Sequence, residues 1–419
     1  MPSPRGAFRR SLSNRTALMS RLSLAVRCVR TVGAMTMLTA MLTAMLTAML
    51  VVPAVSLHAQ AVGEKKAKAD GKQEAKRKDS TAAKKKKDPA NDTTPRKPRQ
   101  LEPFFESETP LPVTLTANIR TLRRDKNPDA VWRPASVKYT DSTGKEVNVA
   151  VRARTRGIWR LKNCEFPPVR MKVADKDTKG TLLHNLGEPK LVNYCRNSDL
   201  YDQYVLQEFM LYRIYRVLTP ISHHVRLLQM TYADSASGKI EASRWGFVIE
   251  DPAHLAERSG GEIVKQKGAD ADDLDGPQSA IAFLFQYMIG NTDFSFGGLH
   301  NAELVRTKTG QIFPVAYDFD FAGAINTNYA VPDPMLRIRS VRERQFRGYC
   351  AFKDDYLSTL ELFKSKKEAI YALYTDPIGQ LLSPRVVKET LGYFDEFYRH
   401  IQTPKEAQKQ VLDDCIGRS

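Results

Sequence analysis

A stretch near the middle of the chain places acidic residues where a fold has to bury them. Residues 277–290 are largely apolar and predict a helix, which is followed by a polar loop containing Asp293. Residues 312–317 then predict an apolar strand, and Asp318 and Asp320 come at its end. Because a buried carboxylate is unfavourable unless a metal ion or hydrogen-bond donors stabilise it, this stretch predicts such a partner nearby. We expect the rest of the chain to be organised around it.

The positive charge of the chain is concentrated in its first hundred residues. The formal net charge is +17, and about +15 of it falls in residues 1–100. The remaining residues, 101–419, are therefore close to neutral. Because nucleic-acid binding depends on a basic surface, this distribution argues against nucleic acid as a partner of the folded domain.

The chain begins with features of a targeting segment. Residues 1–30 contain seven arginines and no acidic residue, and the run from Thr31 to Leu57 is uncharged. An A-x-A site follows at 59–61, so we predict a secretory signal peptide over 1–61. The uncharged run is also long enough to span a bilayer, and an uncleaved signal anchor is the alternative. Both interpretations predict an exported protein that is periplasmic, part of the cell envelope or secreted.

The segment after the leader lacks the side chains that a core requires. Residues 62–100 are rich in lysine and alanine and contain almost no large apolar residues. Such a segment cannot bury enough surface to offset its conformational entropy, so we predict a disordered linker. We favour a solvated spacer for its lysine run at 84–87, and contact with an anionic surface is the alternative. We expect the folded domain over 101–419.

The cysteine count is compatible with disulfide bonds. Of five cysteines, Cys28 lies in the leader and four remain, an even number that suits an oxidising compartment. Among the three pairings of these four, we favour Cys164 with Cys195 and Cys350 with Cys415. Buried free thiols are the alternative.

Hydrophobic periodicity predicts a strand-rich first part and a helical second part. Alternation indicates a strand at 113–119, a hairpin at 136–154 and a second hairpin at 225–250. A helix capped by Asp199 and running to about Leu218 is apolar nearly all round, which predicts burial between layers. We therefore expect an α+β fold with two lobes, and acidic loops where the lobes meet.

Cationic side chains gather in the first part. In the strand predicted at 169–173, Arg170 and Lys172 point to one face and apolar residues to the other. Arg156 stands beside Gly157 shortly before this strand. Arginines beside a glycine favour an anion site, because guanidinium groups bind phosphate in a bidentate manner. A solvated basic face is the alternative.

Glu208 is the acidic residue in the middle of the apolar helix. A carboxylate buried there needs a cationic partner. Lys172 or a nearby arginine meets that need, and a surface pair with Arg213 or Arg216 is the alternative.

These motifs, in this order and spacing, resemble the CotH kinase-like family (spore coat protein H and its relatives), a divergent branch of the protein-kinase-like fold. The chain looks most like exported bacterial relatives, and the resemblance covers roughly residues 110–350. The residues that carry it are Arg156-Gly157 and the segments 164–170, 191–196, 204–215, 247–251, 289–293, 299–301 and 317–320.

The resemblance implies a two-lobed protein-kinase-like fold. Its strand-rich N-lobe, about 101–250, would contain one buried helix, and its C-lobe, about 251–419, would be mainly helical. The resemblance also implies a phosphotransferase that uses ATP and Mg²⁺. Such an enzyme moves a phosphoryl group from a nucleotide to a hydroxyl of a protein or glycan acceptor.

The resemblance assigns roles to the acidic residues. Asp293 is expected to orient or deprotonate the acceptor hydroxyl, and Asn301 to be the metal-side amide of the same loop. Asp318, helped by Asp320, is expected to hold Mg²⁺ against the phosphates.

The remaining roles fall on the strand-rich part. Lys172 or Arg170 is expected to reach the phosphates, with Glu208 as its helix partner. The hinge beside the adenine is expected at 247–250, which ends in Glu250.

Departures from the family pattern leave a second function open. The chain has no G-x-G-x-x-G loop, so the phosphates would depend on the Arg156-Gly157 turn. Eight positions separate Asp293 from Asn301, against five in typical protein kinases. Exported space is also poor in ATP. The alternative is a non-catalytic, pseudokinase-type binding protein or a structural protein of the cell envelope, and convergence of Asp293 and Asp318 opposite a cation would favour the enzyme.

A hydrolase is the class that the sequence disfavours. The seven histidines show no metal-ligand spacing, and the chain has no G-x-S-x-G motif.

Overall fold

The computed structural model describes residues 98–417, which belong to the unit 90–419. The predicted signal peptide or anchor at 1–61 lies outside the described residues, and so does the predicted linker at 62–100 except for its last three residues. None of the helices within 98–417 is long and apolar enough to cross a membrane.

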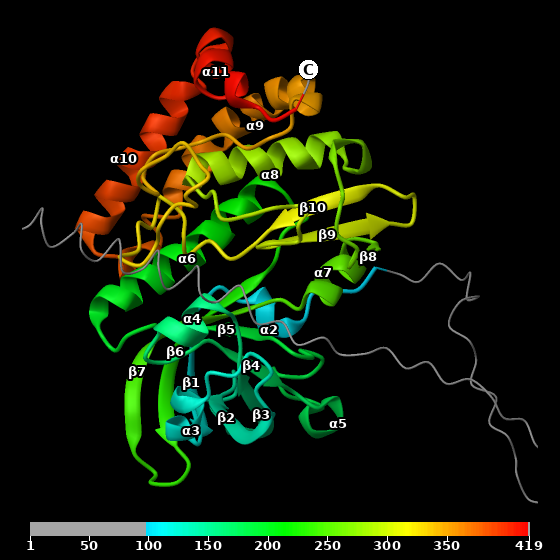
Figure 1. Cartoon of the computed structure of the whole chain (residues 1–419). Helices are drawn as coiled ribbons and strands as arrows, with labels where there is room; N and C mark the ends of the chain where they lie inside the picture. Colours follow the sequence, from blue (N-terminus) through cyan, green and yellow to red (C-terminus); the bar gives the residue numbers. More distant parts are fainter. Residues whose placement is uncertain (1–97, 418–419) are drawn as a thin grey trace, which may run out of the picture. The chain divides into compact units, whose positions relative to one another are not determined.

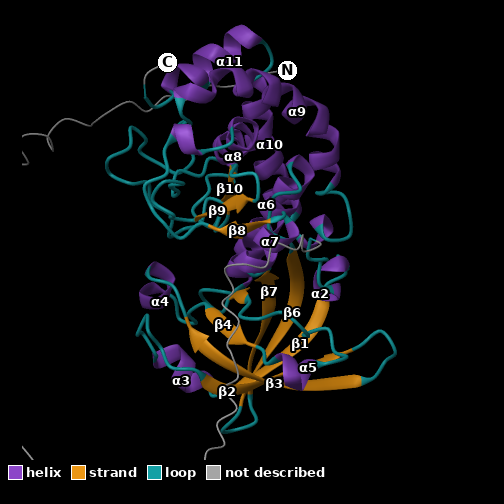
Figure 2. Ribbon diagram, turned by 90° about the vertical axis from the view of Figure 1, so that its right-hand side faces the viewer, coloured by secondary structure: helices purple, strands orange, loops and turns teal. Residues whose placement is uncertain are grey.

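Seven strands form a closed barrel in the N-terminal part of the described chain (Figure 2). They are β1 (Leu111–Ala117), β2 (Arg133–Thr140), β3 (Glu146–Thr155), β4 (Val169–Lys172), β5 (Lys190–Val192), β6 (Val225–Asp234) and β7 (Ile240–Ile249). Their order around the barrel is β1-β2-β3-β4-β5-β7-β6. The pair β1–β6, which closes the barrel, is parallel, and all other neighbours are antiparallel.

Alternation along the strands fills the barrel with apolar side chains. In β4, Val169 and Met171 are buried while Arg170 and Lys172 face outward, as the sequence pattern predicts. The neighbouring strand β3 alternates in the same way. The cations of these strands therefore lie on the outer face of the barrel.

The C-terminal part is mainly helical and carries a small sheet (Figure 1). Its main helices are α8 (Gly276–Ile289), α9 (Lys353–Ala372), α10 (Pro384–His400) and α11 (Pro404–Gln410). The sheet has the order β10-β9-β8 and consists of β8 (Gly261–Ile263), β9 (Ala302–Thr307) and β10 (Ile312–Ala316). Short helices elsewhere are α2 (Pro103–Glu106), α3 (Ile119–Arg124), α4 (Trp159–Asn163), α5 (Asp175–Thr178) and α7 (Pro252–Arg258). Single 3₁₀ turns lie at Ala271–Asp273, Cys350–Phe352, Gly379–Leu381 and Leu412–Asp414.

Helix α6 (Asp199–Leu218) lies between the barrel and the helical part. It contacts β6 and β7 on one side and α8 and α9 on the other. Every residue from Val205 to Tyr215 is buried, which agrees with the apolar pattern of the sequence. The predicted cap is wrong by one position, because Ser198 occupies the N-cap and Asp199 is the first helical residue. There Asp199 pairs with Arg244.

Two disulfide bonds join the four cysteines of the described chain. Cys164 is bonded to Cys195, and Cys350 to Cys415, so the favoured pairing is confirmed. The first bond links the end of α4 to the segment after β5, and the second ties the residues before α9 to the C-terminal end. Disulfide bonds indicate an oxidising, exported environment.

The expected two-lobed protein-kinase-like fold is wrong. The strand-rich part is a closed mixed barrel with a helical region after it. The predicted hairpins are present as β2–β3 and β6–β7. Closure depends instead on the parallel pairing of β1 with β6, which aligns Leu111 with Leu228. Periodicity identifies strands and their hairpin neighbours, but it carries no information about which distant strand covers an open edge.

Candidate functional site

Charged side chains from six segments meet between the barrel and the helical part. We call the carboxylates of Glu208, Asp293, Asp318 and Asp320 the acidic group. We call the side chains of Arg156, Arg160, Arg170 and Lys190 the cationic group. Members of the two groups lie close enough to one another for electrostatic interaction.

Asp318 follows β10 and has an unusual backbone conformation. Its φ angle is +63°, in the left-handed region that aspartate tolerates better than most residues. The backbone N–H of Asp318 donates a hydrogen bond to the hydroxyl of Tyr212 in α6, at 2.9 Å. The Asp318 carboxylate makes no hydrogen bond or ion pair with another residue of the described range, although Arg156 and Lys190 are electrostatic neighbours. This carboxylate is therefore available to a ligand.

Asp320 lies two residues further on and is buried. It accepts a hydrogen bond of 3.2 Å from the hydroxyl of Tyr329. Burial, together with the negative charge of Asp318, raises the pKa of Asp320 to about 7. Asp320 also lies within electrostatic reach of Asp293, so the strand end and the loop after α8 do converge.

Glu208 brings a third carboxylate to the same place from α6. Its side chain is only 2% exposed, and its Oε1 atom has no hydrogen-bond partner within the described range. Burial, together with the charges of Asp320 and Asp318, raises the pKa of Glu208 well above its ordinary value. The cations that oppose this shift are Arg160 and Arg156. Arginines, rather than Lys172, are thus the cations whose charge acts on Glu208.

Two members of the cationic group, Arg170 and Lys190, belong to a row of positive charges across three barrel strands. Arg154 of β3 is in register with Arg170 of β4, which is in register with Lys190 of β5. Like charges directly opposite one another destabilise a sheet, so this row favours an anionic ligand or anionic neighbours. One such neighbour is Glu303 of β9, whose Oε1 lies 3.7 Å from Nζ of Lys190.

Lys190 is the most enclosed lysine of the site. Its side chain is 12% exposed, and Nζ lies 4.1 Å from the centroid of the Tyr317 ring. Burial lowers the pKa of Lys190 to about 8; Arg156 and Arg170 add to the lowering, and Glu303 opposes it. At neutral pH this lysine is still mostly charged, which suits a group that binds phosphate.

The turn between β3 and α4 supplies the two remaining cations. Gly157 has a φ angle of +89°, a conformation that favours glycine, and this turn carries Arg156 and Arg160 on its two sides. Arg160 donates a hydrogen bond to the carbonyl of Asn193. The Nε atoms of Arg156 and Arg160 are buried without a hydrogen-bond partner among the described residues. Both guanidinium groups therefore keep donors for a ligand.

The loop after α8 holds Asp293 in a defined orientation. Its Oδ1 lies 2.8 Å from Nε2 of His300, and its Oδ2 accepts a 3.0 Å hydrogen bond from Nδ2 of Asn301. The side chain of Arg347 donates to the backbone carbonyls of Thr292 and Phe294, on either side of Asp293. The Asp293 side chain stays 39% exposed, so a substrate hydroxyl can approach it.

Three predicted site residues lie elsewhere or do something else. Lys172 faces outward and pairs with Glu188 at 2.9 Å, and Glu188 also lies 4.0 Å from Arg170. Glu250 is buried and pairs with Arg258 at 3.0 Å. The remaining hinge residues, 247–249, are at most 2% exposed, so this segment offers no surface to an adenine. Asn301 is turned toward Asp293 rather than toward Asp318.

The sequence analysis missed Lys190, Arg160 and Tyr329. The sequence around Lys190 carries no signal for its role. Lys190 lies opposite Arg170 in the sheet, and this pairing is visible only once the strands are aligned. Arg160 stands in the same short motif as Arg156. Nothing in the sequence around Tyr329 indicates its hydrogen bond to Asp320.

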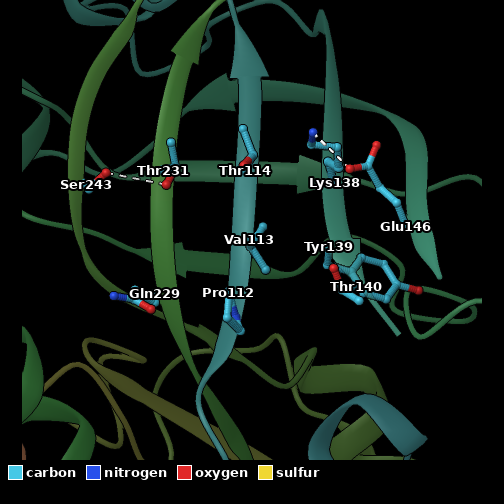
Figure 3. Close-up of a pocket in the computed structure, with 10 residues that line it drawn as sticks. All are labelled: Pro112, Val113, Thr114, Lys138, Tyr139, Thr140, Glu146, Gln229, Thr231 and Ser243. Carbon is cyan, nitrogen blue, oxygen red and sulfur yellow. Dashed lines mark hydrogen bonds and ion pairs between the residues drawn. The ribbon is translucent and has the colours of Figure 1, made fainter. Parts of the chain in front are cut away.

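The surface also has hollows that lack such chemistry. Figure 3 shows one of about 340 Å³ on the outside of the barrel, over β1, β2, β3, β6 and β7. Its charged residues, Lys138 and Glu146, neutralise each other at 3.1 Å, and a contact of 3.4 Å joins Thr231 to Ser243. We therefore assign it no function.

The acidic group is suited to a hard cation. Within residues 98–417, no group of three or more His, Cys, Asp or Glu side chains is placed to hold a metal ion by itself. Mg²⁺, however, is commonly held by one or two carboxylates together with phosphate oxygens and water. The unpaired carboxylate of Asp318 beside Asp320 fits that requirement.

Neither the protein-family models nor the curated proteins compared with this chain give a match.

Proposed function

We propose that the protein is an exported phosphotransferase that uses ATP and Mg²⁺ and phosphorylates a hydroxyl of a protein or glycan. The observation that carries the proposal is the unpaired carboxylate of Asp318, next to Asp320, opposite buried cations with free donors. The resemblance to the CotH kinase-like family supports the same chemistry, while the fold itself is a different one. Phosphoryl transfer needs neutralised charge and aligned reactants, and it needs no covalent nucleophile.

The cationic group would bind the phosphates of the nucleotide. Arg156 and Arg160 have unused donors, and guanidinium groups match phosphate geometry. Lys190, rather than Lys172, is the lysine in our proposal, because it lies beside Arg156 and Asp318. Arg170 adds positive charge next to it.

Asp318 and Asp320 would hold Mg²⁺. The ion, when bound, neutralises the negative charge of the phosphates during transfer. Because two carboxylates alone form an incomplete site, we expect appreciable Mg²⁺ binding only together with the nucleotide.

Asp293 would act on the acceptor. It orients the acceptor hydroxyl and takes its proton as the hydroxyl oxygen bonds to the γ-phosphorus. The bond between the γ-phosphorus and the bridging oxygen breaks, and the nucleoside diphosphate leaves with that electron pair. His300 and Asn301 fix the carboxylate, so Asn301 becomes a positioning residue in this scheme.

The oxidising environment that the disulfides indicate agrees with the predicted export. We place the protein in the periplasm, in the cell envelope or outside the cell. The acceptor would then be an envelope or extracellular protein or glycan.

A second candidate is a non-catalytic nucleotide-binding protein of the envelope. One observation favours it: both oxygens of the Asp293 carboxylate already have a partner, in His300 and Asn301. The two candidates share a nucleotide site and differ in whether phosphate is transferred.

The test uses the full chain with its disulfides intact. ATP with Mg²⁺ should raise the melting temperature of the wild type and of the surface control Glu361→Gln, and should not raise that of Asp318→Asn. Transfer of labelled γ-phosphate, onto the protein itself or onto envelope material, then separates the enzyme from the binding protein. If ATP with Mg²⁺ left the melting temperature of the wild type unchanged, both candidate functions would be excluded.

A further inference from the structure

An exposed tryptophan stands directly beside the proposed phosphate cations. Trp159 and Ile158 lie between Arg156 and Arg160 in the sequence, and they are 37% and 77% exposed. Single exposed apolar side chains are normal on a protein surface, but these two are adjacent and stand between two cations of the proposed phosphate site. The turn therefore offers an apolar surface next to donors for an anion.

The indole ring of Trp159 is supported from behind by other rings. It lies 5.0 Å from the Tyr329 ring, with an interplanar angle of 30°, and meets the Phe321 ring edge-on at 5.8 Å. The hydroxyl of Tyr329 in turn donates to Asp320 at 3.2 Å. Only one aromatic ring thus separates Trp159 from a predicted ligand of Mg²⁺, and the support fixes the orientation of the indole.

Other aromatic side chains near the cations are already covered. Lys190 lies over the Tyr317 ring at 4.1 Å. Trp132 has the guanidinium of Arg154 at 4.7 Å and Nζ of Lys172 at 5.7 Å from its ring. No cation of the described chain lies over the ring of Trp159, whose ring partners are aromatic.

We propose that Trp159 is the platform on which the base of the donor nucleotide stacks, with Ile158 at its edge and the phosphates on Arg156 and Arg160. This inference rests on the proposed function. It also gives a place for the base, which cannot lie against the expected hinge at 247–250 because those residues are buried. Stacking on an aromatic ring uses the face of a base and not its edges, so the site accepts several nucleotides.

The experiment separates the base from the phosphates. Affinities of the full, oxidised chain for ATP and for tripolyphosphate, both with Mg²⁺, are measured by calorimetry. Stacking of one base on an aromatic side chain is worth about 1–3 kcal/mol, so Trp159→Ala should weaken ATP binding about 5- to 160-fold. Its affinity for tripolyphosphate should stay unchanged. Trp159→Phe should restore most of the ATP affinity, and Ile240→Ala, another exposed apolar residue, should change neither ligand.

A second measurement does not depend on the Trp159→Ala variant being folded. The chain has three tryptophans, so the double variant Trp132→Phe, Trp245→Phe leaves Trp159 as the only one. Its fluorescence should be quenched by ATP and by GTP, and left unchanged by tripolyphosphate.

The inference would be overturned if Trp159→Ala weakened the binding of ATP and of tripolyphosphate equally. It would also be overturned if ATP bound to the double variant without changing the fluorescence of Trp159. In both cases the phosphate site of the proposed function would stand. A wild type that binds neither ligand would instead overturn the proposed function, and the inference with it.

Discussion

The two sides of the site differ in how their charges are compensated. On the barrel side, Lys190 has Glu303 as a neighbour, and Arg160 donates to a backbone carbonyl. On the side of the helical region, Asp318 is unpaired and the pKa of Asp320 is raised to about 7 by burial and by the charge of Asp318. Glu208, between them, leaves one buried oxygen without a partner.

This difference shows where the fold gives up stability. The barrel side places its cations by strand register, and Glu303 offsets part of their repulsion. The acidic side keeps carboxylates close together that repel one another, and two of them, Glu208 and Asp320, are buried. Groups with shifted pKa values of this kind are typical of functional sites, where a ligand relieves the repulsion. The comparison therefore predicts opposite effects when the two sides are mutated.

The largest effect is expected at Asp293. The substitution Asp293→Asn keeps the size of the side chain and removes its ability to take a proton, so labelled-phosphate transfer should fall about 10²- to 10⁴-fold. Affinity for ATP with Mg²⁺ should stay within about twofold of the wild type. Transfer at the wild-type rate in this variant would show that Asp293 is not the base.

The next effect is expected on the barrel side. A hydrogen bond to a charged group is worth about 1.5–3 kcal/mol, so Lys190→Ala should weaken ATP binding about 10- to 160-fold in calorimetry. Lys172→Ala is the matched control, since Lys172 pairs with Glu188, and it should bind ATP normally. Weaker ATP binding in Lys172→Ala alone would instead support Lys172, the lysine expected from the sequence, as the residue that binds the phosphates.

Mutation of the acidic side should stabilise the protein. The pKa of Asp320 is about 7 in the folded protein and 3.8 ordinarily, because of burial and the charge of Asp318. Between roughly pH 4 and pH 7 the folded state therefore binds more protons than the unfolded state, and the contribution of Asp320 to stability falls as pH rises through this window.

At pH 8, Asp320→Asn should raise the free energy of unfolding by about 1–3 kcal/mol and flatten its dependence on pH between 4 and 7. Denaturant unfolding at several pH values measures both. A variant less stable than the wild type at pH 8 would mean that Arg160 compensates Asp320 fully.

The smallest effect is expected at the turn between β3 and α4. Gly157 and Gly144 both have a positive φ, +89° and +84°, and no atom lies within 4 Å of an added Cβ at either position. Changing either to alanine should cost about 1 kcal/mol of stability from the backbone alone. Only Gly157→Ala should also weaken ATP binding, by a few-fold, because it moves Arg156 and Arg160. Equal ATP affinity in Gly157→Ala and Gly144→Ala would show that the turn between β3 and α4 does not take part in ATP binding.

Local features of this fold could be predicted from the sequence. Alternation predicted the strands that become β3 and β4, the apolar pattern predicted the burial of α6, and cysteine parity favoured the disulfides that are present. The approach of Asp293 to Asp320 could also be expected, since both follow apolar segments.

Long-range features could not be predicted. Closure of the barrel depends on a parallel pairing of β1 with β6, for which no short-range pattern exists. Lys172 and Lys190 both occupy outward positions on their strands, so the strand pattern does not tell which of them meets the helical region. The loop that turns Asn301 toward Asp293 has φ angles of +50° at Leu299 and +48° at Asn301. The left-handed region is common for asparagine but rare for leucine, so the sequence gives no sign of this conformation at Leu299.

The central claim is that the two sides of the site hold one nucleotide, with Mg²⁺ on the acidic side only. Its most direct test is calorimetric titration of the full chain with ATP, with and without Mg²⁺, for the wild type, Lys190→Ala and Asp318→Asn. We predict that Mg²⁺ strengthens ATP binding in the wild type and in the weaker-binding Lys190→Ala, and that it has no such effect in Asp318→Asn. Absence of ATP binding in the wild type, or an equal effect of Mg²⁺ in Asp318→Asn, would contradict the account.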